Sequence, residues 1–112
     1  MKGTQLGEFE ELVLLAVAVL GENAYAIAVF DELNKTTGRK IILSSVHKSL
    51  LRLEGKGFLS SFLGEPTASR GGKAKRLYVL TKFGVKVLQD SRDLRNSFWE
   101  RIQLSALKGQ MS

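Results

Sequence analysis

The chain has 112 residues, a length that fits one domain with a hydrophobic core of its own. It contains no cysteine, which excludes a disulfide framework, thiolate chemistry and a zinc–thiolate site and suits a reducing cytoplasm. The longest apolar run, residues 12–20, is about half as long as a membrane span, and acids precede it where an export signal would be basic. We therefore expect a cytoplasmic protein.

The net charge of +6 is unevenly distributed along the chain. Residues 39–86 hold eleven lysines and arginines against two glutamates, whereas residues 1–38 carry a net charge of −4 and residues 87–112 a net charge of +1. A basic segment of this kind is the electrostatic footprint of a module that binds a phosphate backbone. The distribution predicts nucleic-acid binding through the middle of the chain.

A first helix is predicted from Gly7 or Glu8 to Leu20, because apolar residues recur at helical spacing and acids occupy the first turn. Gly21 ends it. Apolar residues also lie on its other faces, which predicts that it packs on more than one side, with a partner subunit on the second. Its predicted inward face consists of Leu12, Leu15, Ala16 and Val19.

A second helix is predicted over residues 24–37, with Asn23 as its N-cap and Gly38 as the C′ glycine that ends it. The β-branched stretch at residues 41–43 is predicted to pair as a short edge strand. The predicted inward side chains of this second helix are Tyr25, Val29, Phe30 and Leu33.

A third, amphipathic helix is predicted over residues 45–56, with Ser44 and Ser45 as N-cap candidates. Its apolar stripe consists of Val46, Leu50 and Leu53, with Leu51 at the margin. The opposite face is basic and rich in hydrogen-bonding groups. If this face enters a major groove, its cations would reach guanine acceptors or phosphates, and the serines would bind phosphate oxygens at the helix N-terminus. The predicted DNA contacts of this helix are Ser44, Ser45, His47, Lys48 and Arg52.

A β-hairpin is predicted to follow, with strands over residues 58–64 and 75–80 and a loop that contains Pro66, Gly71 and Gly72. A flexible polar hairpin would explain the glycines but not four cations within seven positions. We expect these cations to contact the DNA backbone, with the loop tip near a minor groove. A nucleotide-binding loop is disfavoured, since no helix follows the Gly-Gly-Lys run. The four cations are Arg70, Lys73, Lys75 and Arg76.

A long last helix is predicted over residues 82–107, capped by Thr81. Its narrow apolar seam extends beyond what a small globular body covers, so we predict a homodimer closed by this helix. The predicted division is therefore a DNA-binding part at residues 1–81 and a dimerisation helix at residues 82–112. The seam consists of Val87, Ser91, Leu94, Phe98 and Ile102. Trp99 beside it is either dimer packing or the wall of a cavity for a small aromatic effector.

The predicted order of elements is that of a winged helix-turn-helix, an α+β fold that is mostly α. Five local features carry a closer resemblance. They are Leu6-Gly7-Glu8-Phe9-Glu10, Tyr25-Ala26, Leu50-Leu51-Arg52-Leu53-Glu54 with Gly57, Gly64-Glu65-Pro66 with residues 70–76, and Tyr78, Leu80-Thr81 and Gly84. Together these features resemble the PadR family of transcriptional regulators over residues 6–88. The single helix that follows is similar to the family's compact subfamily.

This resemblance implies a cytoplasmic, dimeric, DNA-binding repressor that releases a pseudo-palindromic operator when a ligand binds. Some compact relatives are understood to bind aromatic molecules at the dimer axis. The chain departs from the family pattern at His47, where the family usually has a tyrosine, so the contact made by that phenol does not carry over.

Two other functions are weighed against a DNA-binding regulator. A winged helix can also be a protein-interaction module, which here would bind an acidic partner, and fold alone does not exclude it. An enzyme is disfavoured because the chain has one histidine, no cysteine and no clustered carboxylates beyond the first helix from which to assemble a catalytic site. A metal site at His47 is disfavoured for the same reason, and no cofactor is expected.

Overall fold

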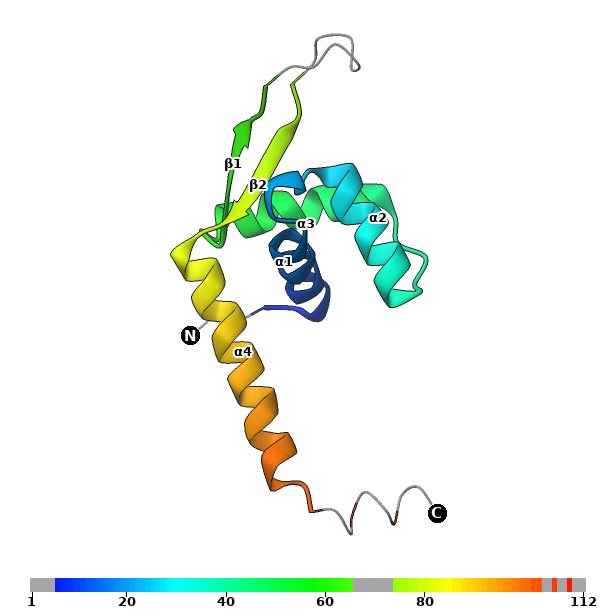
Figure 1. The fold of residues 1–112 in the computed structure, drawn as a ribbon, viewed down its shortest axis with the longest axis vertical. Helices are drawn as coiled ribbons and strands as arrows, with labels where there is room; N and C mark the ends of the chain where they lie inside the picture. Colours follow the sequence, from blue (N-terminus) through cyan, green and yellow to red (C-terminus); the bar gives the residue numbers. More distant parts are fainter. Residues whose placement is uncertain (1–5, 66–73, 104–105, 107–108, 110–112) are drawn as a thin grey trace.

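The structure is a computed structural model that describes residues 6–65, 74–103, 106 and 109. In this part of the chain it contains four α-helices, one short 3-10 helix and two β-strands. Figure 1 shows a body of three helices from which the β-hairpin and the last helix extend in opposite directions. The elements in order are α1 (Glu8–Leu20), η2 (Gly21–Asn23), α2 (Ala26–Thr37), α3 (Leu43–Gly55), β1 (Leu59–Leu63), β2 (Arg76–Leu80) and α4 (Lys82–Arg101).

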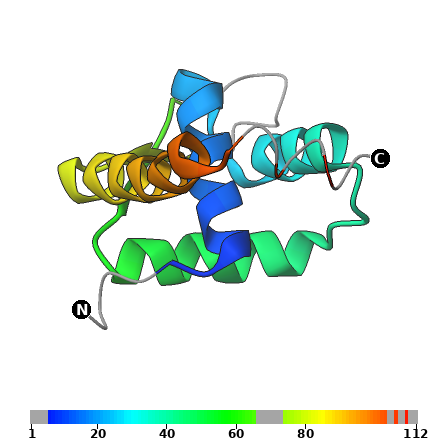
Figure 2. The ribbon, with the colours of Figure 1, turned by 90° about the horizontal axis from the view of Figure 1, so that it is seen from below.

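Helix α1 lies at the centre of the body, and α2, α3, α4 and β2 pack around it. Seen from below in Figure 2, α3 lies on one side of α1 and α4 on another. The core is formed where α1, α2, α3 and the hairpin meet. Its largest fully buried side chains are Leu14, Leu50, Leu53, Leu59, Val13, Val29 and Val46.

The predicted bounds of α1 are confirmed, but its predicted inward face is right at Ala16 and wrong at Leu15 and Val19. Leu15 is 43% exposed and Val19 is 72% exposed, while Leu12 is partly buried. An apolar pattern that runs nearly all round a helix does not specify one inward face, so the positions of α2, α3 and β2 decide it. The buried residues of α1 are Glu10, Val13, Leu14, Ala16 and Val17.

Helix α2 begins two residues later than predicted, and Asn23 is not its N-cap. Residues 21–23 form η2, and Tyr25, in extended conformation, precedes the helix. The helix starts late because residues 24 and 25 pair with β2. Tyr25 forms an isolated β-bridge with Leu77, and the Ala24 carbonyl accepts a hydrogen bond of 2.9 Å from the Tyr78 N–H. The predicted edge strand at residues 41–43 is wrong, because Ile41 and Ile42 form no strand and Leu43 begins α3. Tyr25 occupies the place beside β2 instead.

The hairpin is confirmed to within one residue at each strand end. Strands β1 and β2 pair antiparallel, from Leu59 opposite Leu80 to Leu63 opposite Arg76. Thr81 caps α4 as predicted, and its Oγ1 accepts a hydrogen bond of 3.1 Å from the Gly84 N–H.

Helix α4 ends earlier than residue 107, the predicted end. It stops at Arg101, and Ile102 has an extended backbone with ψ 120°. The last turns of α4 have exposed side chains and therefore lack the packing that stabilises most helices in proteins. Spacing alone does not indicate this end.

Candidate nucleic-acid interface

Helix α3 is amphipathic as predicted, with its apolar side in the core. The buried side consists of Val46, Ser49, Leu50 and Leu53. The outward side presents every DNA contact predicted on this helix as an exposed residue: Ser44, Ser45, His47, Lys48 and Arg52. Leu51 was predicted at the margin of the apolar stripe, but it is 66% exposed and belongs to this outward side.

Helix α3 starts earlier than predicted, and this changes the role of two serines. The helix begins at Leu43, with Ile42 in the N-cap position and no side-chain cap. Ser44 and Ser45 therefore lie inside the first helical turn, and their prediction as N-caps is wrong. The Ser45 and Val46 N–H groups bond the Ile42 carbonyl, so main-chain bonding begins before the serines. Both serines remain exposed at the N-terminal end of α3.

A buried acid on α1 anchors the other end of α3. Glu10 is 7% exposed, and its carboxylate accepts hydrogen bonds of 2.9 and 3.2 Å from Lys56 Nζ and one of 3.1 Å from the Gly7 N–H. Burial by itself would raise the pKa of Glu10, but the bonds from Gly7 and Lys56 outweigh burial and lower the pKa. Glu10 is therefore a charged anchor. The signal that could have identified it is helical spacing, which places Glu10 on the same face of α1 as Val13, Leu14 and Val17.

Arg52 lies at the edge of the outward face because of this anchor. Its guanidinium Nη1 is 3.8 Å from Glu10 Oε2, and its side chain is 64% exposed. The arginine thus leans toward α1 while it remains accessible. Lys48, one turn before Arg52, is also exposed on this face.

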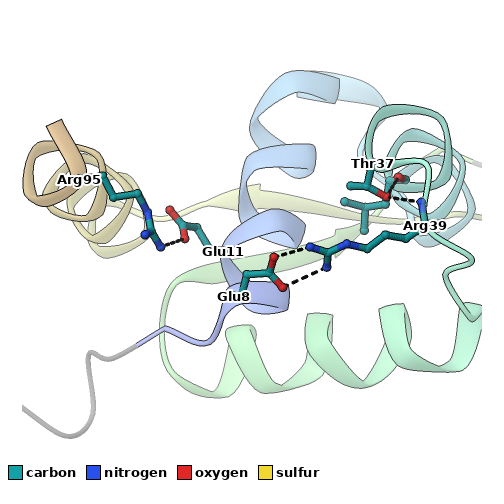
Figure 3. Close-up of polar contacts among 6 residues, drawn as sticks. Glu8, Glu11, Thr37, Arg39 and Arg95 are labelled. Carbon is teal, nitrogen blue, oxygen red and sulfur yellow. Dashed lines mark hydrogen bonds and ion pairs between the residues drawn. The ribbon is translucent and has the colours of Figure 1, made fainter. Parts of the chain in front are cut away.

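Two further carboxylates in the first turn of α1 hold neighbouring elements. In Figure 3, Glu8 bonds the Arg39 guanidinium at both oxygens, one at 3.0 Å, and this ties the α2–α3 connection to α1. Figure 3 also shows Glu11, which accepts a bond of 2.9 Å from Arg95. Glu11 accepts a second bond, of 2.8 Å, from the Ser91 hydroxyl, and both bonds tie α4 to α1. The bonds from Arg39 and Arg95 lower the pKa of Glu8 and of Glu11 respectively. The first turn of α1 therefore contacts the α2–α3 connection through Glu8, the end of α3 through Glu10 and α4 through Glu11.

The stem of the hairpin positions two of the four predicted cations. Arg76 is exposed, and its Nη1 donates a bond of 3.0 Å to Ser61 Oγ, whose hydroxyl donates one of 2.8 Å to Glu54. Lys75 Nζ lies 3.8 Å from the centre of the Tyr25 ring, a cation–π contact that draws it toward the body. Arg70 and Lys73 lie outside the described residues. On the described stem, Arg76 is thus the more exposed cation.

The C-terminal half of the predicted α4 seam is open in the single chain, whereas Val87 and Ser91 are partly buried and Val87 packs against the core. Leu94 is 62% exposed, Phe98 58%, Trp99 61% and Ile102 39%. Beside the seam, Trp99 lines an open groove of about 540 Å³ between α4 and α1, together with Leu15 and Ala18. Arg92 and Arg95 also line this groove. These apolar surfaces have no cover among the described residues.

No family model and no curated protein matches the sequence. The solved structures that resemble the chain include the following three. An hsRosR complex is 20% identical, with a TM-score of 0.68, and the match covers 98% of this chain and 89% of that one. A PadR family transcription regulator from Clostridium difficile is 20% identical, with a TM-score of 0.61, and the match covers 80% and 91%. The Aeropyrum pernix ORC1 protein in complex with DNA is 22% identical, with a TM-score of 0.59, and the match covers 85% and 27%.

The fold is a PadR-like winged helix. This confirms the predicted fold class and the fold that the sequence resemblance implied. In this fold α2 and α3 form the helix-turn-helix, α3 occupies the position of its second helix, and the β1–β2 hairpin occupies the position of the wing. Within the described residues, no helix is long and apolar enough to cross a membrane, and no acidic or histidine cluster could hold a metal ion.

Proposed function

We propose that the chain is a sequence-specific DNA-binding regulator of transcription of the PadR type. The observation that carries this proposal is the outward face of α3, where exposed serines, His47 and Lys48 lie on a helix whose other side is buried in the core. The solved relatives support it, since one is named a transcription regulator and another is in complex with DNA. The charge of the segment around α3 points the same way.

In this proposal α3 enters the major groove and the wing lies along the backbone. Lys48 and His47 reach base edges or phosphates, and Ser44 and Ser45 bind phosphate oxygens near the helix N-terminus, where the helix dipole favours negative charge. Arg76 contacts the backbone from the wing stem, while Arg52 works from the edge of the recognition helix. Lys75, with Arg70 and Lys73, completes the proposed set of wing cations.

The regulator acts as a homodimer in this proposal. The exposed apolar seam of α4 packs against its copy, so residues 1–81 bind DNA and residues 82–112 dimerise. Two recognition helices would then occupy successive major grooves, about 34 to 36 Å apart, on a pseudo-palindromic operator. Exposed Leu15 and Val19 of α1 are available to extend the interface.

The regulator is a ligand-responsive repressor in this proposal. The groove beside Trp99 has apolar walls with Arg92 and Arg95 among its lining residues, which suits a small, flat aromatic effector. An occupant there would lie between α4 and α1, next to the Glu11–Arg95 bond that joins them. A shift of α4 would change the separation of the two recognition helices and release the operator.

The proposal is tested with alanine variants of two cations on the proposed DNA face. Arg76→Ala is expected to weaken binding to all duplexes by a similar factor and to reduce the salt slope by about one for each phosphate that is no longer neutralised. Arg52→Ala is expected to relax base preference at one position of the site. Lys35→Ala, on α2 and outside the basic segment, is the matched control and is expected to bind like the parent. Binding is measured by fluorescence anisotropy against a panel of duplexes.

Unchanged affinity for Arg76→Ala would remove the wing stem from the interface. Equal weakening on every duplex for Arg52→Ala would make that arginine a phosphate contact. If Lys35→Ala weakened binding as much as either variant, the face would be generically cationic and the proposal would be contradicted.

A further inference from the structure

The outward face of α3 has an apolar residue near its centre. Leu51 lies seven residues, about two turns, after Ser44 and one turn after His47 and Lys48, so all four share the outward face. It is opposite the buried stripe of Val46, Leu50 and Leu53, and 66% of it is exposed. Every other exposed side chain on this face of α3 is polar or charged.

We propose that Leu51 reads the C5-methyl group of thymine in the major groove. This inference rests on the proposed DNA-binding function and adds a specificity-determining residue to it. Leucine has no hydrogen-bond donor or acceptor, so its only favourable partner on a base edge is apolar. The thymine methyl is the apolar group that the major groove displays.

The neighbouring residues favour this partner over others. Lys48, beside Leu51, brings the helix to polyanionic DNA, and the exposed serines supply polar contacts around it. Contact with a thymine methyl removes apolar surface from water on both molecules. Contact with guanine, adenine or cytosine at that position would instead cover polar base atoms with no partner, which is unfavourable.

The structure also separates Leu51 from the proposed dimer surface. Helix α4, which carries Leu94 and Phe98, lies on a different side of α1 from α3. Arg52, the next residue, leans toward Glu10, so its charge does not cover Leu51 from that side. The exposed Leu51 is thus positioned to contact the same DNA as Lys48.

The test compares thymine with deoxyuridine, which differs only by the methyl group. A preferred duplex is first selected from random sequences, and each thymine is then replaced in turn. At one thymine in each half-site, the parent protein is expected to bind the uracil duplex about fourfold more weakly, which is the effect of removing one buried methyl-sized group. Leu51→Ala is expected to bind the thymine and uracil duplexes equally at that position. Leu51→Gln, which keeps the length of the side chain, is expected to behave in the same way.

Ile27→Ala, a half-exposed residue on α2, is the matched control and is expected to keep the parent's preference for thymine. Because Leu51 is exposed, both its variants should retain the parent's circular dichroism spectrum and melting temperature. The inference is overturned if the parent shows no preference at any thymine, or if Leu51→Ala keeps the parent's ratio. Selection that yields no preferred duplex would contradict the proposed function itself, and the inference with it.

Discussion

Gly84→Ala is expected to destabilise the protein by about 3 kcal/mol or more, although alanine normally stabilises a helix relative to glycine. Gly84 is buried in the first turn of α4, where a Cβ would overlap the Phe58 carbonyl oxygen and lie 2.9 Å from Leu80 Cδ2. The carbonyl is held in place because it accepts a bond of 3.1 Å from the Thr81 N–H. The whole helix would have to move away from the hairpin. Urea unfolding at fixed protein concentration measures the change in stability.

Gly55→Ala is the matched control. Gly55 is exposed at the end of α3 and a Cβ there would meet nothing within 4 Å. Its φ is not positive, so alanine adopts the same backbone and is expected to stabilise by up to about 1 kcal/mol. Opposite signs for the two variants are the expected result. A Gly84→Ala protein as stable as the parent would show that α4 does not pack on the hairpin this closely.

Phe98→Glu is expected to convert the proposed dimer into a monomer and to weaken operator binding by about a hundredfold or more. Phe98 is 58% exposed and lies between Leu94 and Ile102 in the open half of the apolar seam, so a carboxylate there would face its copy across the interface. A monomer binds only one half-site of the operator. It lacks a second, linked recognition helix at high effective concentration near the other half-site. Analytical ultracentrifugation measures the mass, and anisotropy on the operator measures the affinity.

Ser97→Glu adds the same charge one residue away, on the polar side of α4 near Arg101. It is expected to remain dimeric and to bind DNA like the parent. If Phe98→Glu kept the parent's mass, the seam would not be the dimer interface. A monomeric Phe98→Glu variant with undiminished operator binding would contradict the need for two linked recognition helices.

Local signals are sufficient to predict most of the fold. The third helix, the hairpin and the Thr81 cap each have a distinct local signature, and the structure confirms them within two residues at their ends. Tyr25 is different, because its extended backbone depends on pairing with Leu77, more than fifty residues away. No local pattern reports such a contact. The edge strand is consequently predicted in the wrong segment.

The candidate site is predictable in composition but not in its internal contacts. Exposure of His47 and Lys48 follows from helical periodicity. The lean of Arg52 toward α1 does not, because it depends on Glu10, which belongs to a different helix. The central position of Leu51 is within reach of the sequence, since a helix starting at Leu43 with a stripe centred on Leu50 and Leu53 turns it outward. The prediction that Leu51 lies at the margin of the apolar stripe follows its residue type more than its helical spacing, and so misses its exposed position.

We propose that this protein binds DNA with sequence preference, and one binding experiment tests this directly. We would measure fluorescence anisotropy against a random duplex and against the DNA upstream of its own coding sequence, at about 50 and about 200 mM salt. We expect the protein to bind the upstream DNA about a hundredfold or more tightly than the random duplex, and its affinity to fall about a thousandfold between the two salt concentrations. Equal, weak binding to both duplexes that vanishes at the higher salt would contradict it.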